Sequence, residues 1–478
     1  MVTPDSDSLA RHDIAVTDGR IARVGPGIPA ADAVTVVEGG GRYAFPGVVD
    51  GHQHWGIYNP LEHDAGTESR ACAQGGVTTA ISYLRTGQYY LNRGGPYRDF
   101  MPVALEAARG RSYVDYAFHL APMTSSHIDE LPELIEEFGV VSFKIFMFYG
   151  GFGLHGASSS QRDFLMIPDG EAYDYAHFEF VMRGIQAARE QFPELAGDIS
   201  LSLHCETAEI MRAYTQIVHA SGQLQGLEAY SAARPPHSEG LAVTIASYLA
   251  HETELPSINL LHLSSAKAME AALTMAKAFP HIDFRREVTI GHLLADFHTA
   301  SGIGGKVNPP LRSAADVEKL WEHLLAGEVD WVVSDHACCR DEMKFGDPRD
   351  DVFLAKSGFG GTEYLLPGLV TAAARRGLPL RRIAELTAAN PAKRYGLHTK
   401  GTIAEGYDAD IALVDPRASW TVRAEDSFSA QEYTPFEGFE MTARVTDTFV
   451  RGHQTLTNGQ LTGTPHGTYL HRPTTRPA

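Results

Sequence analysis

The sequence predicts an α/β fold: a (β/α)8 TIM-type barrel with a small β-sandwich domain formed discontinuously by both ends of the chain. Residues 49–397 alternate short apolar, strand-like runs with helical stretches. Residues 1–48 and 398–460 instead contain short alternating runs separated by Gly and Asp turns. Several polar side chains stand at the ends of the apolar runs, and a barrel of parallel strands brings such ends together on one face.

The first barrel strand is expected within residues 44–54, AFPGVVDGHQH, which read as a loop entering a short buried strand. His52 and His54 end this strand at positions i and i+2, so both imidazoles point to the same side. Asp50 has the same strand parity and is a candidate to orient the rings. A His-x-His pair alone is weak evidence for a metal site, because many such histidines are hydrogen-bonded structural groups.

A later strand is expected in residues 143–149, FKIFMFY, where Lys144 interrupts an apolar run. A lone ammonium there would carry a high desolvation cost, so the lysine must be neutral, paired or chemically modified. Alternatively, it lies on an edge strand with its head reaching water. A neutral amine can add carbon dioxide to become a carbamate, an anionic ligand with two oxygens that can bridge two metal ions.

Three further candidates each follow an apolar run: His204, His262 and Asp335. An isolated histidine or aspartate at a strand end is usually a structural group. The joint pattern of four histidines, one lysine and one aspartate, each at the end of a strand-like run, predicts a site for two metal ions.

At this point the chain resembles the amidohydrolase superfamily, and within it the cyclic-amidase group of hydantoinases, dihydropyrimidinases, allantoinases and dihydroorotases. The resemblance extends to residues 75–79 (GGVTT), 306–312 (KVNPPLR) and 390–393 (NPAK). Residues 13–25 and 400–411 look like the small β-domain of that family. Compared with these relatives the chain starts late, as if a first strand were missing, which implies either a start codon assigned too far downstream or a reduced small domain.

The resemblance implies a role for each candidate residue. His52 and His54 would bind the more buried metal, His204 and His262 the second, and Lys144, as N6-carboxylysine, would bridge them. Asp335 would be both a ligand and the general base, and Tyr149 would donate to the developing oxyanion. Two divalent ions would polarise an amide carbonyl and provide hydroxide near neutral pH. Zinc suits these ligands best, with manganese, cobalt or iron as alternatives.

The implied reaction is hydrolysis of a cyclic amide or imide C–N bond, of hydantoinase or dihydropyrimidinase type. Gly56 stands where dihydroorotases usually have an arginine for a substrate carboxylate, which disfavours such a substrate. Asn308 and Ser357 fall at expected substrate-binding positions, Asn308 in a dihydroorotase-like segment and Ser357 where hydantoinases often have asparagine. The alternatives are an allantoinase-like enzyme, a hydrolase of another ring, or a non-catalytic scaffold; the scaffold is disfavoured because every expected ligand is present.

The segment between Lys144 and His204 is longer than in typical hydantoinases and begins with a Gly- and Ser-rich stretch after Tyr149. It predicts either a lid over the active-site face or a surface excursion. Four apolar residues are candidates to line a side-chain pocket, with core packing as the alternative for each: Trp55, Phe148, Phe152 and Leu154.

Composition predicts a soluble enzyme with a small-molecule substrate. The formal net charge of −19 argues against nucleic acid and anionic membranes as partners, and no apolar run is long enough to span a bilayer. The four cysteines lack the spacing of a zinc knuckle or a disulfide scaffold, so reduced thiols in a cytoplasmic protein are expected. The resemblance implies a homo-oligomer, a tetramer or dimer. Residues 461–478 form a tail expected to be disordered or wrapped on a neighbouring subunit.

Overall fold

Eight parallel strands form the centre of the computed structural model, which describes residues 1–149 and 160–475. They follow one another around the sheet in chain order, each pairing with the next. A parallel bridge between Gln53 and His336 joins the first strand to the segment after the last, so the sheet closes into a barrel. The strands are β4 (Val48–Gln53), β5 (Val77–Leu84), β6 (Asp115–Leu120), β7 (Ser142–Phe146), β8 (Ser200–His204), β9 (Ser257–Leu260), β10 (Asp283–Thr289) and β11 (Trp331–Val333).

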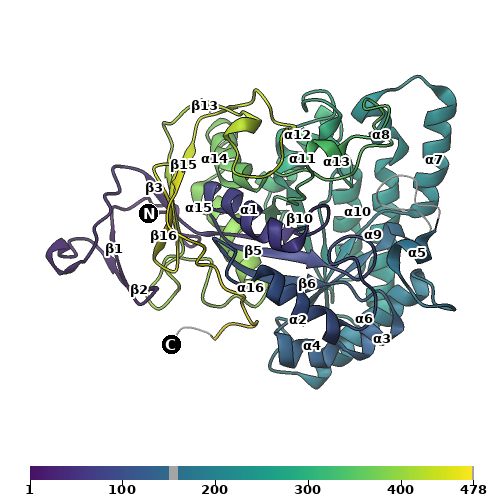
Figure 1. Cartoon of the computed structure of the whole chain (residues 1–478), viewed down its shortest axis with the longest axis horizontal. Coiled ribbons are helices and arrows are strands. Elements are labelled where there is room, and N and C mark those ends of the chain that lie inside the picture. The colour runs from purple at the N-terminus through teal and green to yellow at the C-terminus, as the bar shows by residue number, and fades with distance from the viewer. Residues whose placement is uncertain (150–159, 476–478) are drawn as a thin grey trace.

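Helices surround this barrel in Figure 1 and connect its strands, as right-handed parallel crossovers require. The helices of eight or more residues are α1 (Leu61–Gln74), α2 (Tyr97–Ala108), α4 (Leu131–Phe138), α6 (Tyr175–Gln191), α7 (Ala208–Ser221), α8 (Gly226–Ala233), α9 (Pro236–Glu252), α10 (Ala266–Ala278), α12 (Ala314–Leu325) and α14 (Leu365–Arg376). The shorter ones are α3 (Ser125–Asp129), α5 (Gln161–Leu165), α11 (Ile290–Leu294), α13 (Asp341–Lys344), α15 (Leu380–Ala384) and α16 (Asn390–Arg394). Single turns lie at η1 (Ala30–Asp32), η2 (Met147–Tyr149), η3 (Ile303–Gly305), η4 (Thr362–Tyr364), η5 (Glu385–Ala389) and η6 (Ala424–Asp426).

Six consecutive barrel strands, β4 to β9, are buried at every position. Helices cover the outer face of these parallel strands, and packed side chains fill the inner face. The strands therefore have no solvent-facing side. β7 lies between β6 and β8, so Lys144 does not lie on an edge strand with its head in water. Its side chain is 1% exposed, and that alternative is wrong.

Segments from both ends of the chain form a separate antiparallel sheet beside the barrel, on the left of Figure 1. Its order is β17-β16-β15-β12-β3, so one strand from the N-terminal part, β3, pairs with β12 at the edge of a sheet whose other four strands come from the C-terminal part. The barrel with a small β-domain built from both termini is therefore confirmed, and the domain boundaries stay a prediction. The strands are β3 (Tyr43–Pro46), β12 (Ile411–Asp415), β15 (Arg444–Val450), β16 (His453–Thr457) and β17 (Gln460–Leu461). Two further antiparallel pairs are the hairpin β1 (Asp13–Thr17)–β2 (Arg20–Gly25) and the pair β13 (Trp420–Thr421)–β14 (Glu440–Met441).

The C-terminal tail packs against its own barrel as far as residue 475. Arg472 is fully buried, and its guanidinium donates to Ser142 Oγ and to the carbonyl of Phe118 at 2.8 and 2.6 Å. Leu470 N donates to Tyr116 O at 2.8 Å, which anchors the tail to β6. The expectation of a disordered or subunit-wrapping tail is wrong for residues 461–475, because these contacts hold the tail, through a buried guanidinium and a backbone hydrogen bond, against the barrel of the same chain.

Within residues 1–149 and 160–475, no helix combines the length and apolarity that crossing a membrane requires. The four cysteines are buried and free.

Candidate metal centre

The predicted ligands meet at the carboxyl ends of the barrel strands. His52 lies in β4, Lys144 in β7 and His204 at the last position of β8. His54 directly follows β4, and His262 and Asp335 are the second residues after β9 and β11. His262 and Asp335 have positive φ angles, 35° and 55°. Non-glycine residues in this left-handed region are uncommon and concentrate at functional sites, where the surrounding fold holds them in place.

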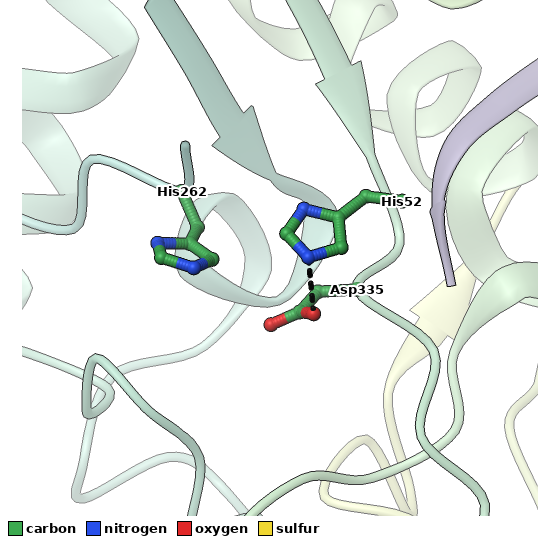
Figure 2. A group of neighbouring side chains, drawn as sticks. All are labelled: His52, His262 and Asp335. Atoms are coloured by element: carbon green, nitrogen blue, oxygen red, sulfur yellow. Dashed lines mark ion pairs between the residues drawn. The ribbon is translucent and has the colours of Figure 1, made fainter. Parts of the chain in front are cut away.

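Four of these side chains converge within hydrogen-bonding distance. Asp335 Oδ1 lies 3.1 Å from His52 Nε2 and 3.2 Å from His54 Nε2. Lys144 Nζ lies 3.0 Å from the same His52 nitrogen. Figure 2 shows His52, His262 and Asp335 turned toward one another, and their ligand atoms lie within 4.8 Å of each other.

Neighbouring polar groups fix which nitrogen each imidazole presents. His52 Nδ1 lies 2.7 Å from Glu287 Oε1, and His54 Nδ1 lies 2.9 Å from the hydroxyl of Tyr90. Both Nε2 atoms are thereby left facing Asp335. Hydrogen bonds of this kind set the tautomer and the ring orientation of metal-binding histidines.

His204 is held through its other ring nitrogen, Nε2, and not through Nδ1. Its Nε2 donates to Glu206 Oε2 at 2.7 Å, and Arg234 donates to both oxygens of the same carboxylate. Although burial alone would raise it, Arg234 and His204 lower the pKa of Glu206 to about 2. An ionised Glu206 stabilises the N–H of His204 at Nε2 and leaves Nδ1 as the nitrogen that could coordinate a metal ion.

Lys144 is placed to be an uncharged amine. Burial lowers its pKa to about 7, and it forms no ion pair with a carboxylate within the described residues. Its Nζ lies 4.0 Å from the ring centroid of Tyr83 and 4.4 Å from that of Phe146. A neutral amine on β7, 3.0 Å from His52 Nε2, is the species that a carbamate requires.

The residues present fit a divalent metal centre. Burial lowers the pKa of His52, His54 and His262 well below the usual value, so these rings are neutral at physiological pH, as coordination requires. His262 Nδ1 is buried without a hydrogen-bond partner in the described part of the chain. The imidazole and carboxylate donors suit zinc and the neighbouring first-row metals. The described geometry thus brings together His52, His54, Lys144, His262 and Asp335, with His204 against His262 at a ring-centroid distance of 4.3 Å.

The orienting groups differ from the sequence expectation. Asp50 accepts hydrogen bonds from Gln53, Ser334 and Thr362, and none from an imidazole, among the residues described. The group that orients His52 is Glu287 of β10, which also accepts from Trp331 Nε1 at 2.8 Å. Glu287 lies between Arg286 and Val288, and nothing in the sequence distinguishes it as an orienting group. Glu206 lies two residues after His204, so strand parity could have identified it as the group that orients His204.

The Glu287→Gln variant is expected to bind metal about 10- to 100-fold more weakly, because the amide cannot accept the Nδ1–H of His52 as strongly as a carboxylate. Competition with a chromophoric chelator measures this loss. Glu130→Gln is the matched control: Glu130 is also buried, but it accepts from the backbone of Tyr97 and Arg98. Equal metal affinity in the Glu287 variant and wild type would contradict the orienting role.

A cleft opens above these ligands. Its lining includes the predicted Tyr149, Asn308 and Ser357, together with Phe148 and Tyr90. Tyr230 donates to Asn308 Oδ1 at 2.5 Å, and Asn308 Nδ2 is buried with no partner in the described regions. The amide therefore presents free N–H groups beside the ligands.

The remaining pocket expectations have mixed outcomes. The carbonyl of Ser357 accepts from the Tyr58 hydroxyl at 2.5 Å, so one of its lone pairs is already used. Trp55 is 1% exposed and donates to Gln53 Oε1; it packs in the core and does not line the cleft. Phe152 and Leu154, with the stretch predicted as a lid or surface excursion, lie outside the described residues.

Comparison with known proteins identifies the family of this chain. The profile described as the amidohydrolase family matches residues 43–455. The chain belongs to the amidohydrolase family and is an enzyme of its hydrolase class.

Among individual proteins, the chain is 32% identical over 465 residues to the allantoinase of Rubrobacter xylanophilus, covering 96% of this chain and 93% of that protein. Among solved structures, it is similar to the D-hydantoinase (dihydropyrimidinase) from Thermus sp., with 27% identity, a TM-score of 0.81 and coverage of 99% and 97% of the two chains. The L-hydantoinase (dihydropyrimidinase) from Arthrobacter aurescens has 26% identity and a TM-score of 0.82, with coverage of 98% and 97%.

Proposed function

We propose that this protein hydrolyses a ring C–N bond of a cyclic amide or imide, in the manner of a hydantoinase or dihydropyrimidinase. The observation that carries the proposal is that His52 Nε2 and His54 Nε2 each lie within 3.2 Å of Asp335 Oδ1, beside the buried Lys144 amine, at the floor of a cleft. His204 and His262 complete the ligand set, and Lys144 would act as N6-carboxylysine.

When bound, two divalent ions, zinc in the first place, would polarise the substrate carbonyl and make hydroxide available near neutral pH. Asp335 takes the proton of the attacking water and delivers it to the ring nitrogen as the C–N bond breaks, so the nitrogen leaves as a neutral group. Tyr149 donates its O–H to the carbonyl oxygen as negative charge develops there. The new C–O bond and the protonated nitrogen together account for the added water.

Asn308 is assigned to substrate binding. Its Oδ1 is occupied by the Tyr230 hydroxyl, so its two N–H groups point to acceptors such as the second carbonyl of an imide. Ser357, on the segment beside Asn308, offers its backbone to the ring.

A second candidate substrate is allantoin, a hydantoin with a ureido substituent. The observation that favours it is the 32% identity with proteins named allantoinase over nearly the whole chain. The fold and the ligand set serve both candidates, since the difference lies in the ring substituent.

The decisive experiment is ring opening by the metal-reconstituted enzyme across dihydrouracil, hydantoin, 5-substituted hydantoins, allantoin and dihydroorotate, with mass spectrometry for the gain of one water. Turnover of dihydrouracil or a hydantoin supports the first candidate, and turnover of allantoin alone supports the second. No turnover with both metals bound would contradict both.

The Asn308→Ala variant is expected to retain its metals and to raise KM roughly 3- to 10-fold, the effect of one lost hydrogen bond. Steady-state kinetics on the best substrate measure the change. Asn390→Ala is the control, because Asn390 Nδ2 donates to the backbone carbonyl of Asp330 and Asn390 does not line the cleft. An unchanged KM for Asn308→Ala would remove Asn308 from the substrate site.

We further propose a homo-oligomer, a tetramer or dimer, in the reducing environment of the cytoplasm, to which four unpaired thiols are suited. Sedimentation equilibrium would give the subunit number.

A further inference from the structure

Arg85, the first residue after β5, lies next to the candidate metal centre but is not one of its proposed ligands. Its side chain is fully buried among aromatic rings. Its guanidinium carbon lies 5.2 Å from the ring centroid of Tyr149, 5.5 Å from that of Tyr90 and 4.8 Å from that of Phe164. Tyr149 and Tyr90 both line the cleft, so the guanidinium lies directly behind two of its walls.

No carboxylate neutralises this guanidinium within the described residues. Its hydrogen bonds run from Nε to the hydroxyl of Tyr149 at 3.1 Å and from Nη1 to the carbonyl of Thr86 at 2.9 Å, and Nη2 has no partner there. A buried cation without an anion is destabilising, since aromatic faces and neutral oxygens compensate only part of its desolvation. Burial of this positive charge is destabilising, and it lies beside a site where negative charge would develop. These two facts together point to a role in the reaction.

The bond to Tyr149 sets the direction of the tyrosine proton. Because Tyr149 Oη accepts the N–H of Arg85, the O–H of Tyr149 is directed away from the guanidinium. The described residues provide no acceptor for that O–H, while Tyr149 lines the cleft with Lys144 and Asp335. A substrate bound in the cleft can supply that acceptor.

The charge of Arg85 also strengthens this donor. Burial raises the pKa of Tyr149, and Arg85 opposes that rise by charge and by hydrogen bonding. A phenol whose oxygen already accepts from a cation gives up electron density from its own O–H, so it donates more strongly to an oxyanion.

We propose that Arg85 is a positioning residue: it holds the hydroxyl of Tyr149 in place and strengthens it as the oxyanion donor. The inference rests on the proposed function, because it assigns Arg85 to the same ring-opening step. Arg85 acts through Tyr149 and touches no reacting atom.

The test compares Arg85→Gln, Arg85→Lys, Tyr149→Phe and the double variant Arg85→Gln/Tyr149→Phe on the best substrate, with metal content measured for each. Arg85→Gln is expected to lower kcat roughly 10- to 100-fold with little change in KM, as for a lost charge-assisted hydrogen bond. Arg85→Lys should recover part of this loss because it keeps the charge. The double variant should be no slower than Tyr149→Phe alone, because both changes remove the same interaction.

Arg70→Gln is the matched control, since Arg70 lies over the ring of Tyr113, 5.5 Å from its centroid, on the outer helix α1. It should leave kcat unchanged. Multiplicative losses in the double variant, or an unchanged kcat in Arg85→Gln, would overturn the proposal.

A second readout does not depend on turnover. In protein labelled with ¹³C at tyrosine Cζ, the signal lost in Tyr149→Phe identifies Tyr149, and its chemical shift should change in Arg85→Gln. If the wild type opens no ring in the panel, the proposed function fails, and the NMR shift alone decides whether Arg85 holds the hydroxyl. An unchanged Tyr149 signal overturns the contact whatever the activity.

Discussion

The Lys144→Ala variant is expected to lose both bound metals and to fall in activity by at least about 10³-fold. The side chain projects from the centre of β7 into the group of ligand atoms, 3.0 Å from His52 Nε2. Burial lowers the pKa of its amine to about 7, so a large share is uncharged at neutral pH and open to carbon dioxide. Removing it takes away the only proposed anionic bridge and leaves neutral imidazoles with Asp335.

Metal analysis after gel filtration and turnover of the best substrate measure this result. Lys144→Met separates loss of the ligand from loss of volume, because methionine fills most of the same space. Adding propionate to Lys144→Ala should restore part of the metal content, since a carboxylate can occupy the vacated position. An alanine variant that keeps two metals per chain and remains active would show that the bridging carbamate is wrong.

Lys344→Met is the matched control for metal retention. Lys344 is also fully buried, and burial lowers its pKa to about 7 as well. Its Nζ donates to the backbone carbonyls of Lys306 and Gly358, at 3.1 and 2.7 Å. This variant is expected to retain both metals, which would show that the effect at Lys144 comes from its place among the ligands and not from burial of a lysine in general.

The Tyr149→Phe variant is expected to keep both metals and to lose about 10²- to 10³-fold in kcat, the usual cost of removing one oxyanion donor. Its ring would still pack against Phe146 and Phe148, so the cleft wall is preserved and KM should change little. The donor matters in the transition state, where the carbonyl oxygen becomes negative, more than in the bound substrate.

Steady-state kinetics with metal analysis on the same samples measure this prediction. Tyr116→Phe serves as a control, because Tyr116 is a buried tyrosine of β6 that does not line the cleft. A Tyr149→Phe variant with wild-type kcat would assign the oxyanion donor elsewhere. Loss of metal from this variant would instead mean that Tyr149 supports the ligands.

Much of the ligand set could be read from the chain because the barrel constrains it locally. Parallel strands buried on both faces are short apolar runs, and their carboxyl ends share one face. A histidine, lysine or aspartate at such an end is therefore placed by its own strand alone. The structure brings His52, His54, Lys144, His262 and Asp335 together as the strand positions indicated.

The partners of those ligands could not be read in the same way. Asp50 has the right strand parity for orienting His52, but parity fixes only the face on which a side chain lies and not its neighbour. The carboxylate that orients His52 is Glu287, 235 residues away along the chain. Arg85 and Tyr149 are 64 residues apart and meet only because β5 and β7 end beside the same cleft.

The sequence by itself determined the barrel, the small domain built from both termini and the residue types that stand at the strand ends as candidate ligands, because these follow from periodicity and from the chemistry of single residues. Only the tertiary structure decided that Glu287, Glu206 and Tyr90 fix the imidazoles, and that the tail packs on its own barrel. Hydrogen bonds between buried polar groups depend on the relative position of strands and helices that are distant in sequence, and that position is set by the packing of the whole barrel.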